Sequence, residues 1–168
     1  MTDEPRWTSD YFREAAGESS RMGRGLVGHV PIVAGLMIVQ GLLELVFGVF
    51  CALFIGLSFM LPAEALGGME PGVMAVLMAI IAVPGIVCGG LHVMAGALNW
   101  SFRRRTLGMV ALGVGLASIF TAYCAPTAIA LAIYGLIVYV NESVALAFQL
   151  GDQGRTKAEI QAAFPPGT

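Results

Sequence analysis

Three long stretches of this chain are nearly free of charged residues, and their length restricts the chain to one class of fold. They run from 30 to 61, from 72 to 100 and from 107 to 150. A helix needs about 20 apolar residues to cross the hydrocarbon core of a bilayer, so the third stretch is long enough for two crossings. Pro126 interrupts it, and proline suits the first turn of a new helix better than the interior of an old one. The pattern predicts four membrane spans, at about 30–61, 72–100, 106–122 and 126–150.

The composition supports the same class. Apolar residues make up 57% of the 168 positions and charged residues 12%, whereas soluble domains contain about 45–50% and about 25%. A soluble domain of this size would have to hide all of these apolar runs in one core. We therefore expect an all-α, polytopic transmembrane four-helix bundle at 26–150, in contact with the lipid bilayer, with tails at 1–25 and 151–168.

The basic residues define the expected orientation in the membrane. Cytoplasmic loops carry an excess of Lys and Arg, and all 9 such residues fall before the first span, between the second and third, or after the fourth. They are Arg6, Arg13, Arg21, Arg24, Arg103, Arg104, Arg105, Arg155 and Lys157. Both termini are therefore expected in the cytoplasm, for a multi-pass protein of a bacterial inner (plasma) membrane. The first tail has more acidic than basic residues, which argues against nucleic-acid binding.

The two tails are predicted to differ. Residues 1–25 are polar and lack the compact apolar core of a cleaved signal peptide, so the first span is expected to remain in the mature protein. We expect this tail to be flexible. In the other tail, Thr156 and Glu159 have the spacing of a capping box, which predicts a short helix at 157–164. That helix either docks on the membrane domain through Ile160 and Phe164 or frays in solvent.

Two of the apolar spans each contain one ionisable residue, and such a residue at membrane depth is expensive enough to be a functional candidate. Glu44 follows Gln40 by one turn, and His92 follows Cys88 by one turn. These four residues form the candidate intramembrane polar site. Glu44 is either a carboxylate that loads and unloads protons or a protonated or hydrogen-bonded residue that fixes the register of the helices, with His92 or a tyrosine as its partner.

The expected depth of the two residues argues against direct contact. Counting from the inner ends of their spans at ~1.5 Å per residue places Glu44 roughly 21 Å deep and His92 roughly 10 Å deep. Contact would require the first helix to start below the membrane surface or to tilt. Cys88 and His92 have a spacing that suits a metal, but two ligands do not complete a site. His29 and His92 differ too much in depth to hold a haem between them, so no metal and no cofactor are expected.

Glycine residues surround both ionisable residues and predict close helix packing. Small residues let helix backbones approach each other in lipid, where association has no hydrophobic driving force. The expected packing glycines are Gly41, Gly48, Gly85, Gly89 and Gly96. At the cytoplasmic interface, Glu142 is expected to pair with the arginines at 103–105 and to anchor helix ends there.

The sequences at 123–139 (YCAPTAIALAIYGLIVY) and 35–41 (GLMIVQG) resemble those of small, uncharacterised bacterial membrane proteins with four spans. The resemblance implies a fold and no activity. Outside the spans there is no nucleophile with a base, no phosphate-binding glycine loop and no acidic pair. We therefore expect no catalytic residues and no enzymatic activity.

Three functions remain open. The leading hypothesis is a structural or accessory membrane protein that packs with itself or with a larger membrane complex through its glycine faces. The alternative is a small proton-coupled transporter or channel that uses Glu44 and His92. A third hypothesis is a metal- or cofactor-binding subunit that uses Cys88 and His92.

Overall fold

The computed structural model describes residues 25–117 and 125–165, and all regular structure in these ranges is helical. The prediction of an all-α fold is confirmed. In chain order the elements are η1 (Leu26–His29), α3 (Val30–Ser58), η2 (Ala63–Leu66), α4 (Pro71–Asn99), α5 (Arg105–Ala117), α6 (Ala125–Val140), α7 (Glu142–Asp152) and α8 (Lys157–Ala163).

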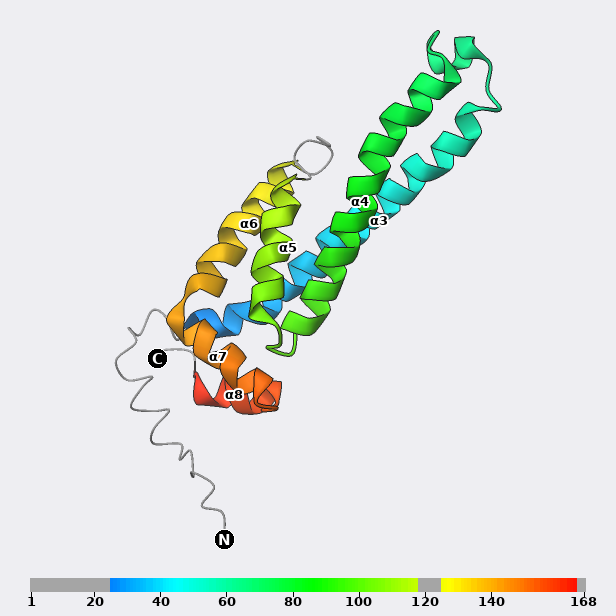
Figure 1. Ribbon diagram of the computed structural model, residues 1–168. Coiled ribbons are helices and arrows are strands. Elements are labelled where there is room, and N and C mark those ends of the chain that lie inside the picture. Colours follow the sequence, from blue (N-terminus) through cyan, green and yellow to red (C-terminus); the bar gives the residue numbers. More distant parts are fainter. Residues whose placement is uncertain (1–24, 118–124, 166–168) are drawn as a thin grey trace.

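The two longest helices, α3 and α4, form an antiparallel hairpin (Figure 1). The α5 and α6 helices pack beside the half of the hairpin that contains the start of α3 and the end of α4. The other half, which ends in the loop with η2, extends beyond them (Figure 1). The short helices α7 and α8 lie across the opposite end from that loop. The hairpin therefore has one half that packs against α5 and α6 and one half that extends beyond them.

Two helical segments are long and apolar enough to cross a membrane, Leu26–Ser58 and Ala63–Asn99. A third crossing is possible if the bent pair α6 and α7 counts as one span. The described part of α5 has 13 residues, which is shorter than the ~20 that a crossing needs. The rest of the predicted third span, the turn with Cys124, and the tail 1–25 except Gly25 lie outside the described residues. The structure thus contains two to three candidate spans, and the four-span arrangement stays a prediction.

The segment predicted as one span at about 126–150 is divided into two helices in the structure. The α6 helix ends at Val140, and α7 leaves it at an angle of 77°. Asn141 is in an extended conformation between them, and its side chain accepts a hydrogen bond from the backbone N–H of Ser143 at 3.0 Å. An Asn side chain that caps a new helix competes with continuation of the old one. The prediction rested on the apolar character of the whole stretch and did not take this capping residue into account.

Glycine contacts hold α3 and α4 close together. A Cβ atom added to Gly41 would lie 2.6 Å from the carbonyl oxygen of Gly89, and one added to Gly89 would lie 2.7 Å from that of Gly41. Gly48 meets the backbone of Ile86, and Gly96 meets the carbonyl oxygen of Ala34. These contacts fix an antiparallel register in which the two backbones touch, as small residues allow in lipid.

A cap of apolar side chains closes the covered end of the bundle. The ring of Phe148 on α7 makes edge-to-face contacts with the rings of Phe102 and Tyr139, at centroid distances of 5.8 and 5.7 Å. Ile160 and Phe164, on and just after α8, are buried in the same cluster. Of the two alternatives for the predicted helix at 157–164, the docked one is therefore observed.

The capping box at the start of α8 is also present. The Thr156 hydroxyl accepts from the backbone N–H of Glu159, and the Glu159 carboxylate accepts from the backbone N–H of Thr156 at 2.8 Å. This reciprocal pair satisfies two backbone donors that a helix start otherwise leaves open. The helix observed, Lys157–Ala163, ends one residue before the predicted boundary.

Candidate functional site

The two ionisable residues of the hairpin are in direct contact. Nδ1 of His92 lies 2.9 Å from Oε2 of Glu44, and Nε2 of Gln40 donates to Oε1 of Glu44 at 2.9 Å. All three side chains are at most 4% exposed. Both carboxylate oxygens thus have a partner, as a buried carboxylate requires to offset the loss of its hydration.

The helix register explains why the expected difference in depth does not separate Glu44 from His92. Gly96 packs between Ala34 and Ile38. The end of α4 is therefore level with residues near 33 of α3, and α3 begins at residue 30, before that level. His92 is then level with Gln40, and Glu44 lies one turn further along. One turn is about 5.4 Å, which the glutamate and histidine side chains together can bridge. The depth estimate was wrong because it assumed that the two helices end flush.

A third helix covers this pair with glycine. A Cβ atom added to Gly115 on α5 would lie 2.5 Å from Cε1 and Nε2 of His92, and one added to Gly108 would collide with the Asn99 amide. His92 and Asn99 are seven residues apart on α4, and Gly108 and Gly115 are seven residues apart on α5. The antiparallel helices therefore place each polar side chain of α4 under a glycine of α5. That shared spacing was the sequence signal that could have identified α5 as the partner of His92.

The polar chain continues onto α6. The hydroxyl of Thr127 donates to Oε1 of Gln40 at 3.1 Å, which connects α6 through Gln40 to Glu44 and His92. Sequence reasoning missed Thr127, because a threonine in the first turn of a helix has no distinctive pattern. Among the described residues, no buried side-chain nitrogen or oxygen lacks a hydrogen-bond partner.

Cys88, the fourth residue of the candidate site, is not part of this chain of bonds. Its sulfur lies 4.0 Å from the carbonyl oxygen of Val114 on α5. Within residues 25–117 and 125–165, no three His, Cys, Asp or Glu side chains come together in a group that could hold a metal ion. The arrangement offers proton exchange between a carboxylate and an imidazole, and it offers no coordination shell.

A second polar cluster lies nearer the capped end. The Asn99 amide lies 3.1 Å from the Tyr139 hydroxyl. With the amide oriented so that both of its polar atoms meet suitable partners, its oxygen accepts from that hydroxyl and its nitrogen donates to the carbonyl oxygens of Arg103 and Arg104. Nε of Arg105 donates to the carbonyl oxygen of Tyr139 at 2.7 Å. Together these bonds tie the α4–α5 turn to the end of α6. Asn99 was not among the site residues expected from the sequence.

The four residues expected at the cytoplasmic interface have different environments. Arg105 binds the α6 backbone, while Arg103 and Arg104 are exposed beside a hollow. Ion pairs within the described part of the chain join His92 to Glu44 and Arg155 to Glu159, so the expected pairs of Glu142 with arginines 103–105 do not form there. Glu142 instead occupies the first turn of α7, where the helix dipole favours a carboxylate.

Comparison with known proteins gives no family for this chain. No protein-family model, no curated protein and no solved structure matches it. Function is therefore inferred from the residues and their geometry. The observed arrangement is a helical protein with candidate membrane spans and a fully bonded polar network buried in its hairpin.

Proposed function

We propose that the protein is an integral membrane protein of structural or accessory type, with four spans, both termini in the cytoplasm and no enzymatic activity of its own. The observation that carries this proposal is the environment of Glu44 and His92. Each bonds to the other, and Gln40 completes the set. A glycine of α5 closes over the imidazole. Polar groups that are bonded and covered in this way stabilise one arrangement of helices.

The pair would fix the register of the hairpin. Sliding α3 by one turn in the direction that carries Glu44 further from the level of His92 would separate the two side chains and leave both in apolar surroundings. Removing one partner of a buried ion pair costs about 3–5 kcal/mol. A slipped register would likewise leave each of the two side chains buried without its partner. The glycine contacts at Gly41 and Gly89 would tolerate such a slip less well still, because the backbones touch there. The buried polar group then acts as a specificity device, as a polar residue does in a coiled coil.

Partners would bind the projecting half of the hairpin. The glycines at which partner helices were expected are occupied within the hairpin itself, so those faces are not free. The half beyond α5 and α6 instead carries exposed apolar side chains on both α3 and α4. They include Phe50, Leu53, Phe59, Met60, Val76 and Ile80. Lipid covers this surface in the free protein, and a second copy or a larger membrane complex would replace part of that lipid.

Photo-crosslinking in native membranes tests the accessory role. A photoreactive residue at Phe50 or Ile80 is expected to capture a second copy or a protein partner, while the same residue at buried Met37 is the matched control and captures neither. Gentle purification followed by identification of what accompanies the protein gives the partner. A lone monomer with nothing captured at either exposed position would contradict the proposal.

Variants of the pair test the structural role separately. Glu44→Leu and His92→Leu alone are each expected to destabilise the protein by about 3–5 kcal/mol, whereas the double variant recovers most of that loss, because an apolar pair of similar volume replaces a buried ion pair at little cost. Additive losses in the double variant would show that the two residues do not act as a pair.

A small proton-coupled transporter or channel is the second candidate, and one observation favours it. The chain Thr127, Gln40, Glu44 and His92 is continuous, and its carboxylate and imidazole lie 2.9 Å apart, close enough to exchange a proton. The test is proton and ion flux in liposomes for the natural protein, Glu44→Gln and His92→Ala, with Ser58→Ala as a control outside the chain. Flux that is the same in all four would remove this candidate.

A further inference from the structure

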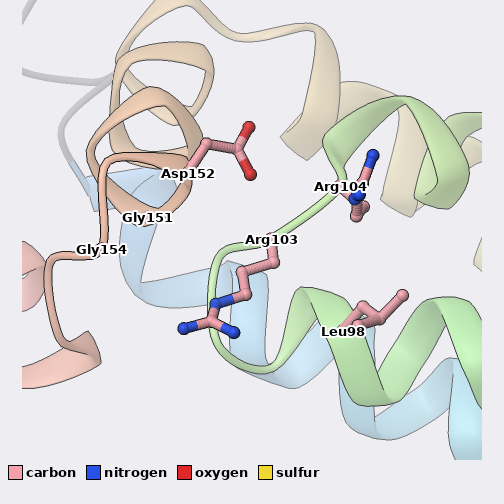
Figure 2. Close-up of a pocket in the computed structure, with 6 residues that line it drawn as sticks. All are labelled: Leu98, Arg103, Arg104, Gly151, Asp152 and Gly154. Atoms are coloured by element: carbon pink, nitrogen blue, oxygen red, sulfur yellow. The ribbon is translucent and has the colours of Figure 1, made fainter.

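A hollow of about 540 Å³ lies where α4, α5 and α7 meet (Figure 2). Its lining residues are Leu98, Arg103, Arg104, Gly151, Asp152 and Gly154. Its volume falls within the ~300–1,000 Å³ of small-molecule sites. The hollow is on the capped end of the bundle, and it is separate from the Glu44 and His92 pair in the hairpin.

The frame of the hollow is held in place by buried groups. Phe102 and Arg104 have positive φ angles of 56° and 61°, which non-glycine residues seldom adopt. The Phe102 side chain is fully buried, and its carbonyl oxygen approaches Gly151 so closely that a Cβ atom would not fit there. The Asn99 amide holds the carbonyl oxygens of the two arginines from below. The loop is therefore positioned by the core, while its charged side chains are left exposed.

The charges around the hollow are of both signs. Arg103, Arg104 and Asp152 are exposed, and none of them belongs to an ion pair within residues 25–117 and 125–165. Figure 2 shows the Asp152 carboxylate reaching from α7 towards the loop, from which the two arginine side chains leave in different directions. A guanidinium binds phosphate with two parallel hydrogen bonds. A carboxylate accepts hydrogen bonds from an ammonium group.

We propose that this hollow binds the phosphoethanolamine headgroup of a membrane phospholipid. On binding, the exposed side chains of Arg103 and Arg104 turn into the hollow and donate to the phosphate oxygens, and the primary ammonium donates to Asp152. Leu98 on the wall of the hollow is the last apolar side chain before Asn99 ends α4, so acyl chains can continue from the headgroup along the hairpin. The proposal depends on the membrane assignment, but it does not depend on the role of the Glu44 and His92 pair.

Binding of individual lipids to the purified full-length protein tests the proposal. Native mass spectrometry from detergent micelles would compare phosphatidylethanolamine, phosphatidylglycerol and phosphatidylcholine with identical acyl chains. The variants are Arg103→Gln, Arg104→Gln and Asp152→Asn. Arg155→Gln is the matched control, because it removes an exposed positive charge close by in sequence without lining the hollow.

The natural protein is expected to bind phosphatidylethanolamine most tightly. Each of the variants Arg103→Gln and Arg104→Gln should weaken all three lipids by about tenfold, as the loss of a charge-assisted hydrogen bond does. The Asp152→Asn variant should lose the preference for the ethanolamine headgroup over the glycerol one. The Arg155→Gln control should bind as the natural protein does. Lipid affinities that do not change in the arginine variants, or that fall equally in the control, would overturn the proposal.

A lipid headgroup and a free phosphate compound offer the same hydrogen-bonding groups to the hollow. Two soluble probes test which of them is the ligand. Glycerophosphoethanolamine is expected to compete with the lipid only weakly, because it has no acyl chains. Inorganic phosphate should compete more weakly still, because it has no ammonium for Asp152. Inorganic phosphate that binds as tightly as phosphatidylethanolamine would overturn the lipid assignment.

Discussion

Substituting Gly89 by alanine tests whether the hairpin depends on backbone contact. A Cβ atom there would lie 2.7 Å from the carbonyl oxygen of Gly41 and 2.8 Å from the backbone nitrogen of Leu45. Both are backbone atoms of a helix and cannot rotate away. Ordinary van der Waals contact begins at 3.4 Å, so α3 and α4 must separate by about 0.7 Å at this point to relieve the clash.

The separation would also reach the polar pair. His92 is one turn from Gly89, so its 2.9 Å contact with Glu44 would lengthen towards about 3.6 Å, which no longer counts as a hydrogen bond. Overpacking alone costs about 1–3 kcal/mol, and weakening a bond to a charged group adds about 1 kcal/mol or more. After subtracting the better helix propensity of alanine, ~1 kcal/mol, we expect a net loss of about 1–3 kcal/mol.

The adjacent residue Gly90 provides the control. Nothing lies within 4 Å of a Cβ atom added there, so Gly90→Ala should stabilise the protein by about 0.5–1 kcal/mol through helix propensity alone. The assay is unfolding in mild detergent by titration with dodecyl sulfate, followed by the fluorescence of Trp100 in a Trp7→Phe background. If Gly89→Ala were as stable as Gly90→Ala, close contact between α3 and α4 would not be what holds the hairpin.

Three further predictions concern the capped end. Phe148→Ala should cost about 3–5 kcal/mol, because it removes a buried ring with two aromatic contacts, whereas Phe50→Ala, at an outward position, should change the midpoint of unfolding little; equal effects would refute this. Asn141→Ala should destabilise the start of α7 by about 1 kcal/mol, seen as faster amide hydrogen exchange there and not in α5. The backbone N–H of Thr156 lowers the pKa of Glu159 below its ordinary 4.5, so the cap of α8 is complete above that pH and is lost as the pH falls through the lowered pKa. The chemical shift of the Thr156 amide should follow the titration of Glu159, and a titration midpoint at or above 4.5 would contradict the lowered pKa.

The sequence predicts the hairpin well, because length and absence of charge are strong signals in a membrane helix. The start of α4 was expected at residue 72 and is found at Pro71, and α3 was expected to begin at residue 30 and does so. The two prolines at these starts are a local signal that needs no knowledge of the partner helix.

The sequence predicts the polar site less completely. It identifies Gln40, Glu44 and His92 from composition alone, but it cannot give the relative position of two helices along their axes. That position is decided by contacts such as Gly96 against Ala34, and each contact involves residues far apart in the chain. The argument from depth against direct contact was wrong for this reason, and a functional role of these residues stays a prediction.

The break at Asn141 departs from the predicted span for another reason. It rests on one side chain whose bond to the Ser143 backbone N–H outweighs the apolar character of the residues around it. Hydrophobicity averaged over a long window does not detect a single capping residue. The short run Asn-Glu-Ser at 141–143 carries the information in sequence, since it combines a preferred N-cap residue with an acidic first turn.

The cap at the end of the bundle has a consequence for biosynthesis. Its buried cluster joins Val27, at the start of the first candidate span, to Ile160 and Phe164 near the other end of the chain. The residues of α3 and α4 are synthesised before those later side chains, so a hairpin that folds during translation does so with its end open. In that order of folding, the register of α3 and α4 is held by the contacts between these two helices before the cap exists. Closure of the cap by α8 would be the last step of assembly.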